Sequence, residues 1–337
     1  MKTKLSFALF LSLGSSAFAV EAAFTTPVGF GTLEGSPAVG GFDSAGLQPG
    51  MNLVGLRLHH NIVTQGHVGT IGKDFAELSV LQGKDKVLSD LALTVGKTYI
   101  LEITSGDKAG VIQEITRWQG VRLTLSDDLA AAGVKSGDKF SLRPAATLNS
   151  VFDLRFTGLL AGENPDTADN VLIPQGTTLG DFRRCFILRL QDGTTGWVDA
   201  ATLQPVGDVP LVYADGLIVQ RKGKTAVKIT TTGEIKTGPT RSVVKSGLNL
   251  VATPYPACSD LQSLGLENDL QKSDRAVEAD KVWLADGPFG NFSTYYLTKD
   301  NQWVNAGNGE AVTGKIPVGS AILIERKGAA ALFCLGD

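Results

Sequence analysis

Short apolar segments separated by glycine, aspartate and asparagine run through most of the chain. Residues 121–125 and 139–143 alternate apolar with polar side chains, which is the period of a strand with one buried face. Two segments favour short helices instead: 129–134, which follows the capping sequence Ser-Asp-Asp, and 261–270. The pattern predicts an all-β protein of tandem sandwich-like or barrel-like units with one or two short helices.

Two segments of the chain have nearly the same strand sequence. The segment "GLIVQRKG" at 216–223 is followed 105 residues later by "AILIERKG" at 321–328. Further matches occur in the same order around these two segments: "ADNV" at 168–171 with "ADKV" at 279–282, Phe182 with Phe292, Trp197 with Trp303, Pro210 with Pro317, and Arg221 with Arg326. Matching turns, strands and prolines in one order indicate an internal duplication.

The duplication suggests the domain organisation. We expect two repeated units, 144–243 and 256–337, which together form a C-terminal β domain at 144–337. Residues 20–143 then form an N-terminal β domain. The length of the chain is sufficient for two domains that each bury a core.

A weaker match links "GMNLV" at 50–54 with "GLNLV" at 247–251. The two RKG segments carry specific expectations about burial. The apolar residues of these strands should be buried: Leu217, Val219, Ile322 and Ile324. Each Arg-Lys pair should mark a solvated strand end before a glycine turn, with Lys222 and Lys327 exposed.

The first residues have the order of a secretory signal peptide. Lys2 and Lys4 precede an apolar stretch at 5–14, and a small-residue cleavage sequence ends at Ala19. We expect a signal peptide at 1–19 and a secreted protein located in the periplasm, at the cell surface or in the medium. The net charge of −3 and the lack of a basic run argue against a nucleic-acid partner. No later apolar stretch is long enough for a transmembrane helix.

The cysteines leave two interpretations open. An exported protein can form a disulfide, but Cys185, Cys258 and Cys334 allow at most one internal bridge. Alternatively, all three are buried thiols that act as small hydrophobic residues. The neighbouring Arg183 and Arg184 would lower the pKa of the Cys185 thiol, but its apolar strand favours a structural role.

No catalytic or metal-binding motif stands out. His59, His60 and His67 lie in one loop-like segment, and adjacent residues of a strand point to opposite faces, so we expect no metal site and no histidine-containing triad. Residues 164–170 offer calcium-type oxygen ligands, but an Asn/Asp turn is favoured. The glycine-rich segment 29–35 lacks the lysine of a phosphate-binding loop.

The four tryptophans are the remaining candidates for a ligand platform: Trp118, Trp197, Trp283 and Trp303. Exposed aromatic side chains on a β scaffold would stack on sugars. However, Trp197 and Trp303 occupy matching positions of the duplication, as repeated core residues would. We therefore favour a core role for them.

The export signal, "FTTPVGF" near the mature start, "GMNLV", "VRLTLSDDL" and "GLNLVATPYP" resemble a family of uncharacterised secreted proteins found mainly in verrucomicrobial bacteria. The resemblance covers most of the mature chain. It implies an exported β-rich protein, but its motifs are those of strands and turns, so it implies no functional residue.

These observations favour a non-enzymatic structural or interaction protein of the cell envelope or surface, without a cofactor. Its partner would be an envelope polysaccharide or a protein, and the sequence leaves its oligomeric state open. Two alternatives remain: a carbohydrate-binding module that uses exposed tryptophans, and a hydrolase with carboxylates brought together by the fold. A cleft that holds two carboxylates of raised pKa would favour the hydrolase.

Overall fold

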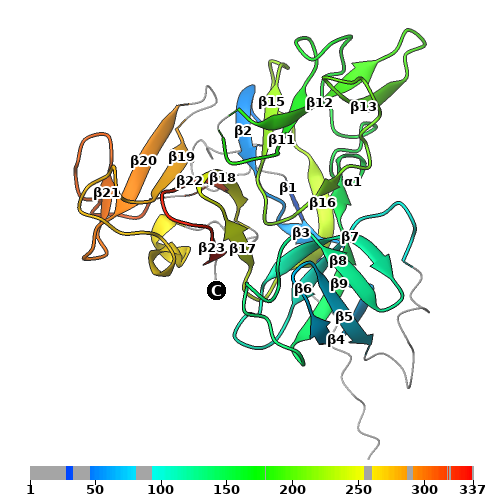
Figure 1. Cartoon of the computed structure of the whole chain (residues 1–337). Helices are drawn as coiled ribbons and strands as arrows, with labels where there is room; N and C mark the ends of the chain where they lie inside the picture. The colour runs from blue at the N-terminus through cyan, green and yellow to red at the C-terminus, as the bar shows by residue number, and fades with distance from the viewer. Residues whose placement is uncertain are drawn as a thin grey trace, which may run out of the picture.

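The computed structural model describes residues 28–32, 46–80, 93–178, 180–253, 260–286, 291–316, 318 and 320–335. Strands make up 45% of the structure and helical residues 4%, which confirms the prediction of an all-β fold. The strands form a closed barrel and several open sheets (Figure 1). Within the described ranges, no helix combines the length and the apolar character needed to cross a membrane.

Six strands close into the barrel in the order β4-β5-β8-β7-β6-β9. Their bounds are Thr64–Ile71 (β4), Phe75–Val80 (β5), Tyr99–Ile103 (β6), Ile112–Gln119 (β7), Arg122–Leu125 (β8) and Lys139–Pro144 (β9). Leu101, Leu123 and Leu142 are fully buried in the barrel core. Register shifts in the pairs β4–β5 and β7–β8 bend these strands, which helps so short a sheet to close.

A five-stranded antiparallel sheet lies above the barrel in Figure 1, in the order β13-β12-β11-β15-β2. Its strands are Gly50–Val54 (β2), Asn170–Pro174 (β11), Phe182–Arg189 (β12), Thr195–Asp199 (β13) and Leu217–Arg221 (β15). Strand β2 belongs to the range 20–143 but pairs with β15 along its whole length. This sheet therefore combines segments from both sides of the expected boundary at residue 143.

A second five-stranded sheet has the corresponding order β21-β20-β19-β22-β18. Its strands are Gly247–Ala252 (β18), Lys281–Ala285 (β19), Phe292–Leu297 (β20), Trp303–Asn305 (β21) and Ala321–Arg326 (β22). In the edge strand of the first sheet, the side-chain amide of Asn52 donates to the carbonyl of Val219 at 3.1 Å. In the edge strand of the second, Asn249 donates to the carbonyl of Ile324 at 3.4 Å. Both edge strands lie outside the ranges 144–243 and 256–337.

The two sheets share an apolar cluster. Leu53 and Ile218 from the first sheet join Leu250 and Leu323 from the second in one group of buried side chains. A single sheet of this size would leave such a face in water. Burial of these side chains between the sheets therefore contributes to the stability of both.

Smaller elements connect these parts. A three-stranded sheet has the order β1-β16-β3, with bounds Val28–Thr32, Thr230–Ile235 and Leu58–His59. Two strand pairs follow: β10 (Ala146–Thr147) with β14 (Pro210–Leu211), and β17 (Arg241–Val244) with β23 (Ala331–Cys334). The helical elements are α1 (Leu148–Val151) and two 3-10 turns, η2 (Leu261–Ser263) and η3 (Leu266–Asn268). The segment 261–270 thus contains two short turns in place of one helix.

The helix expected at 129–134 is wrong, because this segment is a series of turns. The cap exists: the N–H of Ala131 donates to the Asp128 carboxylate at 2.9 Å. Gly133 already adopts a left-handed conformation, with φ of 84°. A single turn between cap and glycine offers too few backbone hydrogen bonds to offset the cost of helix nucleation.

The RKG strands bear out the burial expectations for the apolar residues and the lysines, but not for the two arginines. Buried are Leu217, Val219, Ile322 and Ile324, and exposed are Lys222 and Lys327. The expectation of a solvated arginine is wrong for Arg221, which is 4% exposed. Its Nε donates to the fully buried Asp169 at 2.8 Å. Arg326 pairs in the same way with the buried Asp280. A buried carboxylate requires such a cation, which a local sequence pattern does not reveal.

Replacing Arg221 tests this ion pair. Arg221→Met leaves the Asp169 carboxylate buried without a cation, so it should lower the free energy of unfolding by about 3–5 kcal/mol. Lys222→Met, at the exposed neighbouring position, should change it by less than about 0.5 kcal/mol. Chemical denaturation of both variants measures the difference, and equal effects would contradict the buried pair.

Candidate functional site

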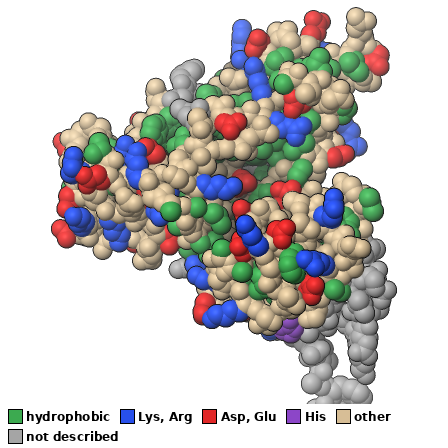
Figure 2. All heavy atoms as spheres, in the orientation of Figure 1, with side chains coloured by type: hydrophobic (Ala, Val, Ile, Leu, Met, Phe, Trp, Pro, Cys, Tyr) green, Lys and Arg blue, Asp and Glu red, His purple; other side chains and the backbone are tan. Residues whose placement is uncertain are grey.

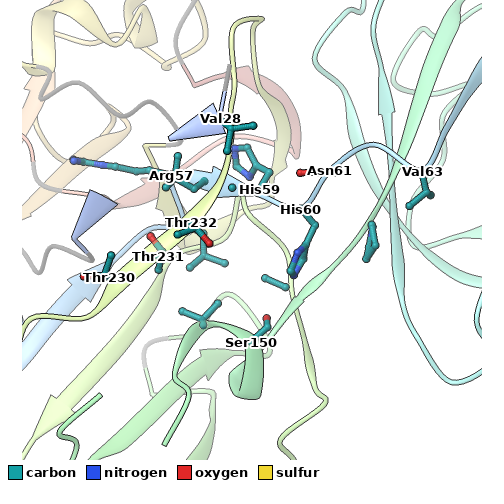
Figure 3. A pocket seen from close by; sticks show the side chains of 16 residues that line it. Val28, Arg57, His59, His60, Asn61, Val63, Ser150, Thr230, Thr231 and Thr232 are labelled. Atoms are coloured by element: carbon teal, nitrogen blue, oxygen red, sulfur yellow. The ribbon is translucent and has the colours of Figure 1, made fainter. Parts of the chain in front are cut away.

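A cavity of about 570 Å³ lies beside strand β3, and we call it the β3 cavity (Figure 3). Its floor and walls come from β3, β16, the start of β1 and the α1 turn. Its polar lining residues are Arg57, His59, His60, Asn61, Ser150, Thr230, Thr231 and Thr232. No carboxylate occurs among the described residues that line it. The cavity therefore offers hydroxyl, amide, imidazole and guanidinium groups to a ligand.

Strand alternation gives the two neighbouring histidines different surroundings. His59 pairs with Glu234 of β16, is 5% exposed, and lies against the Tyr213 ring with 4.3 Å between ring centroids. Its buried Nε2 has no hydrogen-bond partner among the described residues. His60 is exposed, and Figure 3 shows it pointing toward the turn that carries Ser150.

The pKa values of both imidazoles are lowered. Burial, then the positive charges of Arg143 and Lys236 and the neighbouring His60, lower the pKa of His59 to about 3. Burial, Lys97 and Arg143 also lower the pKa of His60. The charged side chains that lower these two pKa values are Arg143, Lys236 and Lys97, and two of them are ion-paired with carboxylates behind the cavity.

A network of buried charges lies behind His59. The Glu102 carboxylate of β6 accepts hydrogen bonds from Arg143 Nη2 at 3.4 Å, from the Tyr213 hydroxyl at 3.0 Å, and from Lys236 Nζ. Arg143 Nη1 also donates to Glu234 at 3.2 Å. Two carboxylates thus face two cations, and the network connects the barrel with β16 and with the segment before β15. Burial lowers the pKa of Lys236, and Glu102 opposes this shift.

A second cavity, of about 240 Å³, lies where the barrel, the first sheet and strands β17 and β18 meet. We call it the Asp215 cavity. Its charged lining residues are Glu114, Asp127, Asp215 and Lys245. The Asp215 side chain is open to this cavity, at the point where its backbone bridges to Val251 of β18.

Two carboxylates of this second cavity, Glu114 and Asp215, have raised pKa values. Although the Asp215 side chain is exposed to the cavity, the elements packed around it partly desolvate it, and this desolvation, with the nearby Glu114 and Asp127, raises its pKa to about 6. Lys245 opposes the shift. Burial also raises the pKa of Glu114. The structure therefore contains the feature expected to favour a hydrolase, a cavity with two carboxylates of raised pKa.

The tryptophans do not form a common platform. Trp197 and Trp303 are 2% and 6% exposed and belong to the core, although Trp303 also borders a further cavity of about 630 Å³. Trp118 lies edge-on to Tyr99 at 5.9 Å, on the barrel. Trp283, on the second sheet, donates its indole N–H to Glu325 at 3.3 Å. The structure thus places all four apart from both cavities.

The remaining candidate residues from the sequence lie in the core, in a turn or in a strand. Cys185 is a buried free thiol, and burial raises its pKa to about 11 despite Arg183, so it is a poor nucleophile. Cys258 lies outside the described residues. The side chain of Asn164 accepts the backbone N–H of Asp166 at 3.0 Å, which makes 164–170 the expected turn. The loop expected around the histidines is wrong for His59, which lies in β3, and for His67, which lies in β4 and pairs with β5 and β9.

Two features could not be found from sequence. The partners of Glu102 are brought together by pairing between distant strands, and no local spacing signals them. Asp215 sits next to the repeated strand, in the sequence "YADGLIV", and its position before a buried strand is its only signal. Neither the β3 cavity nor the Asp215 cavity corresponds to a motif.

The raised pKa of Asp215 predicts a dependence of stability on pH. The folded state favours the protonated carboxyl, so the contribution of Asp215 to stability is present below about pH 4 and is lost as pH rises through about 6. Asp215→Asn should therefore raise the thermal unfolding midpoint at pH 7.5 and leave it unchanged at pH 4. Thermal unfolding at both values measures this effect. Asp300→Asn, at an exposed turn, is the control, and the same response in both variants would contradict the assignment.

Comparisons with known proteins were made at three levels. No family model, no curated protein and no solved structure matches the chain.

Proposed function

We propose that this protein is an exported, non-enzymatic structural or interaction protein of the cell envelope or surface. The observation that carries the proposal is that side chains able to react chemically are buried inside the fold. His59, Glu102 and Arg143 are buried between strands, and Cys185 is a protonated core thiol. Groups of this kind stabilise a scaffold when they are matched to one another.

The surface supports a role in interactions with varied partners. On the face shown in Figure 2, acidic and basic side chains are interspersed among polar and apolar ones. Such a surface has no single-sign field that would direct the protein to nucleic acid. An envelope polysaccharide or an envelope protein is the partner that we propose, in line with the secretory signal at 1–19.

We also infer that the two five-stranded sheets arose by internal duplication. Their strand orders correspond, and Asn52 and Asn249 make equivalent bonds from the edge strands. The buried pair of Arg221 with Asp169 has its counterpart in Arg326 with Asp280. Under this inference each unit includes its edge strand, β2 or β18, so the units are larger and less local than 144–243 and 256–337.

A carboxylate-dependent hydrolase is the second candidate. One specific observation favours it: Glu114 and Asp215 line one cavity, and both have raised pKa values. A carboxyl with a pKa near 6 can donate a proton near neutral pH, which suits a general acid.

Export is tested by N-terminal sequencing of the native protein. Cleavage after Ala19 should give a chain that begins near Val20 and is recovered outside the cytoplasm, because the basic, apolar and small-residue regions are in the order that signal peptidase requires. An intact Met1 in the native protein would contradict export.

The hydrolase alternative is tested by turnover. Incubation of the mature protein with envelope polysaccharide should release no new reducing ends, and Glu114→Gln and Asp215→Asn should behave as the native protein does. Reducing ends that are released by the native protein and lost in both variants would establish the second candidate in place of the first.

A further inference from the structure

We propose that the β3 cavity binds a small ligand that carries an oxyanion, either a carboxylate or a phosphate group. The proposal goes beyond a general interaction role, because it names the site and the chemistry of the ligand. It is independent of whether the protein also performs catalysis, since the carboxylates that favour a hydrolase line a different cavity.

The first step is the size and shape of the site. The cavity volume of about 570 Å³ is in the range of small-molecule sites. Its walls come from strands and turns that are far apart in sequence, so the site exists only in the folded protein. Apolar side chains, including Leu56 and Val151, alternate with polar groups around it. This combination provides both contact area and orientation for a ligand.

The second step is the set of groups that can contact a ligand. His60, Thr230 and Thr232 are exposed and line the cavity, and Asn61 adds an exposed amide. Imidazole, hydroxyl and amide groups can all donate hydrogen bonds to an oxyanion. Figure 3 shows His60 and Thr232 on neighbouring segments that border the same space.

The charged groups that line the cavity also favour an anion. Arg57 lines the cavity, and no carboxylate does so among the described residues. Arg143 lowers the pKa values of both imidazoles, together with Lys236 at His59 and Lys97 at His60. The described lining thus offers an anion one guanidinium and several hydrogen-bond donors, and offers a cation no carboxylate.

Binding of an anion is also coupled to protonation of His60. A bound anion offsets the cations that lower the pKa of His60, so the complex favours the imidazolium form. Binding then takes up a proton, and the affinity should rise as pH falls. The charged groups nearest His60 are Lys97 and Arg143, and Arg143 Nη1 is shared between the His60 carbonyl and the Glu234 carboxylate. The imidazolium would donate a charge-assisted hydrogen bond to the oxyanion.

The experiment is isothermal titration calorimetry of the mature protein with three probes: inorganic phosphate, D-glucuronate and D-glucose. At least one of the two anions should bind, more tightly at pH 5.5 than at pH 7.5, and glucose should not. Binding of phosphate alone would indicate a phosphate-bearing ligand, and binding of glucuronate alone a carboxylated sugar. If neither anion binds, or if glucose binds as well as glucuronate, the proposal is overturned.

Variants separate this site from binding elsewhere. His60→Asn should weaken anion binding by about tenfold or more and abolish its pH dependence, since a charge-assisted bond is lost. Thr232→Val should weaken it by a smaller factor. His67→Asn in β4 and Thr195→Val in β13 are the matched controls and should bind as the native protein does. Unchanged binding in His60→Asn, or equal losses in the controls, would overturn the assignment to the β3 cavity.

Discussion

The buried Glu102 carboxylate is the constraint on which the arrangement of the barrel depends. A charge in this position is tolerated only if cations and hydrogen-bond donors surround it. Arg143 comes from the barrel itself, whereas Lys236 and Tyr213 come from segments outside it. The barrel therefore cannot move relative to these segments without leaving a charge unmatched. A network of this kind specifies one relative placement, beyond any net contribution that it makes to stability.

The same network shapes the chemistry of its surroundings. Arg143 also bonds Glu234 and the backbone carbonyl of His60, so the guanidinium reaches the edge of the β3 cavity. Its charge is one reason why the pKa values of the two adjacent imidazoles are lowered. The Asp215 cavity differs, because desolvation and then the neighbouring Glu114 and Asp127 raise the pKa of Asp215 there. The protein thus presents one cavity whose described lining has no carboxylate and one with an excess of carboxylates.

Within the two five-stranded sheets, a second type of buried pair recurs. Asp169 accepts the Arg221 guanidinium and the backbone N–H of Lys222, and Asp280 accepts the corresponding groups of its own RKG turn. The aspartate closes the turn after the strand and neutralises its last side chain. This explains why arginine precedes lysine in both segments: the arginine is an internal partner, and the lysine faces water.

The sequence by itself determined the all-β class, the burial of the apolar positions in the RKG strands and the turn at 164–170. These features depend on alternation and on turn residues, which are local in the chain. The core position of Trp197 and Trp303 follows instead from their matching places in the two repeated segments. The helix expected at 129–134 does not form, because the segment between the capping residue and Gly133 is too short for a stable helix.

Only the tertiary structure decided which strands became neighbours. The pairing of β2 with β15, the matching of Glu102 to Lys236, and the place of Asp215 beside β18 all join residues that are far apart in sequence. Each depends on the free energy of the whole packed arrangement, including the burial of charge, and not on the preference of any single segment. Both cavities arise at such junctions, which is why the residues that line them carry no motif.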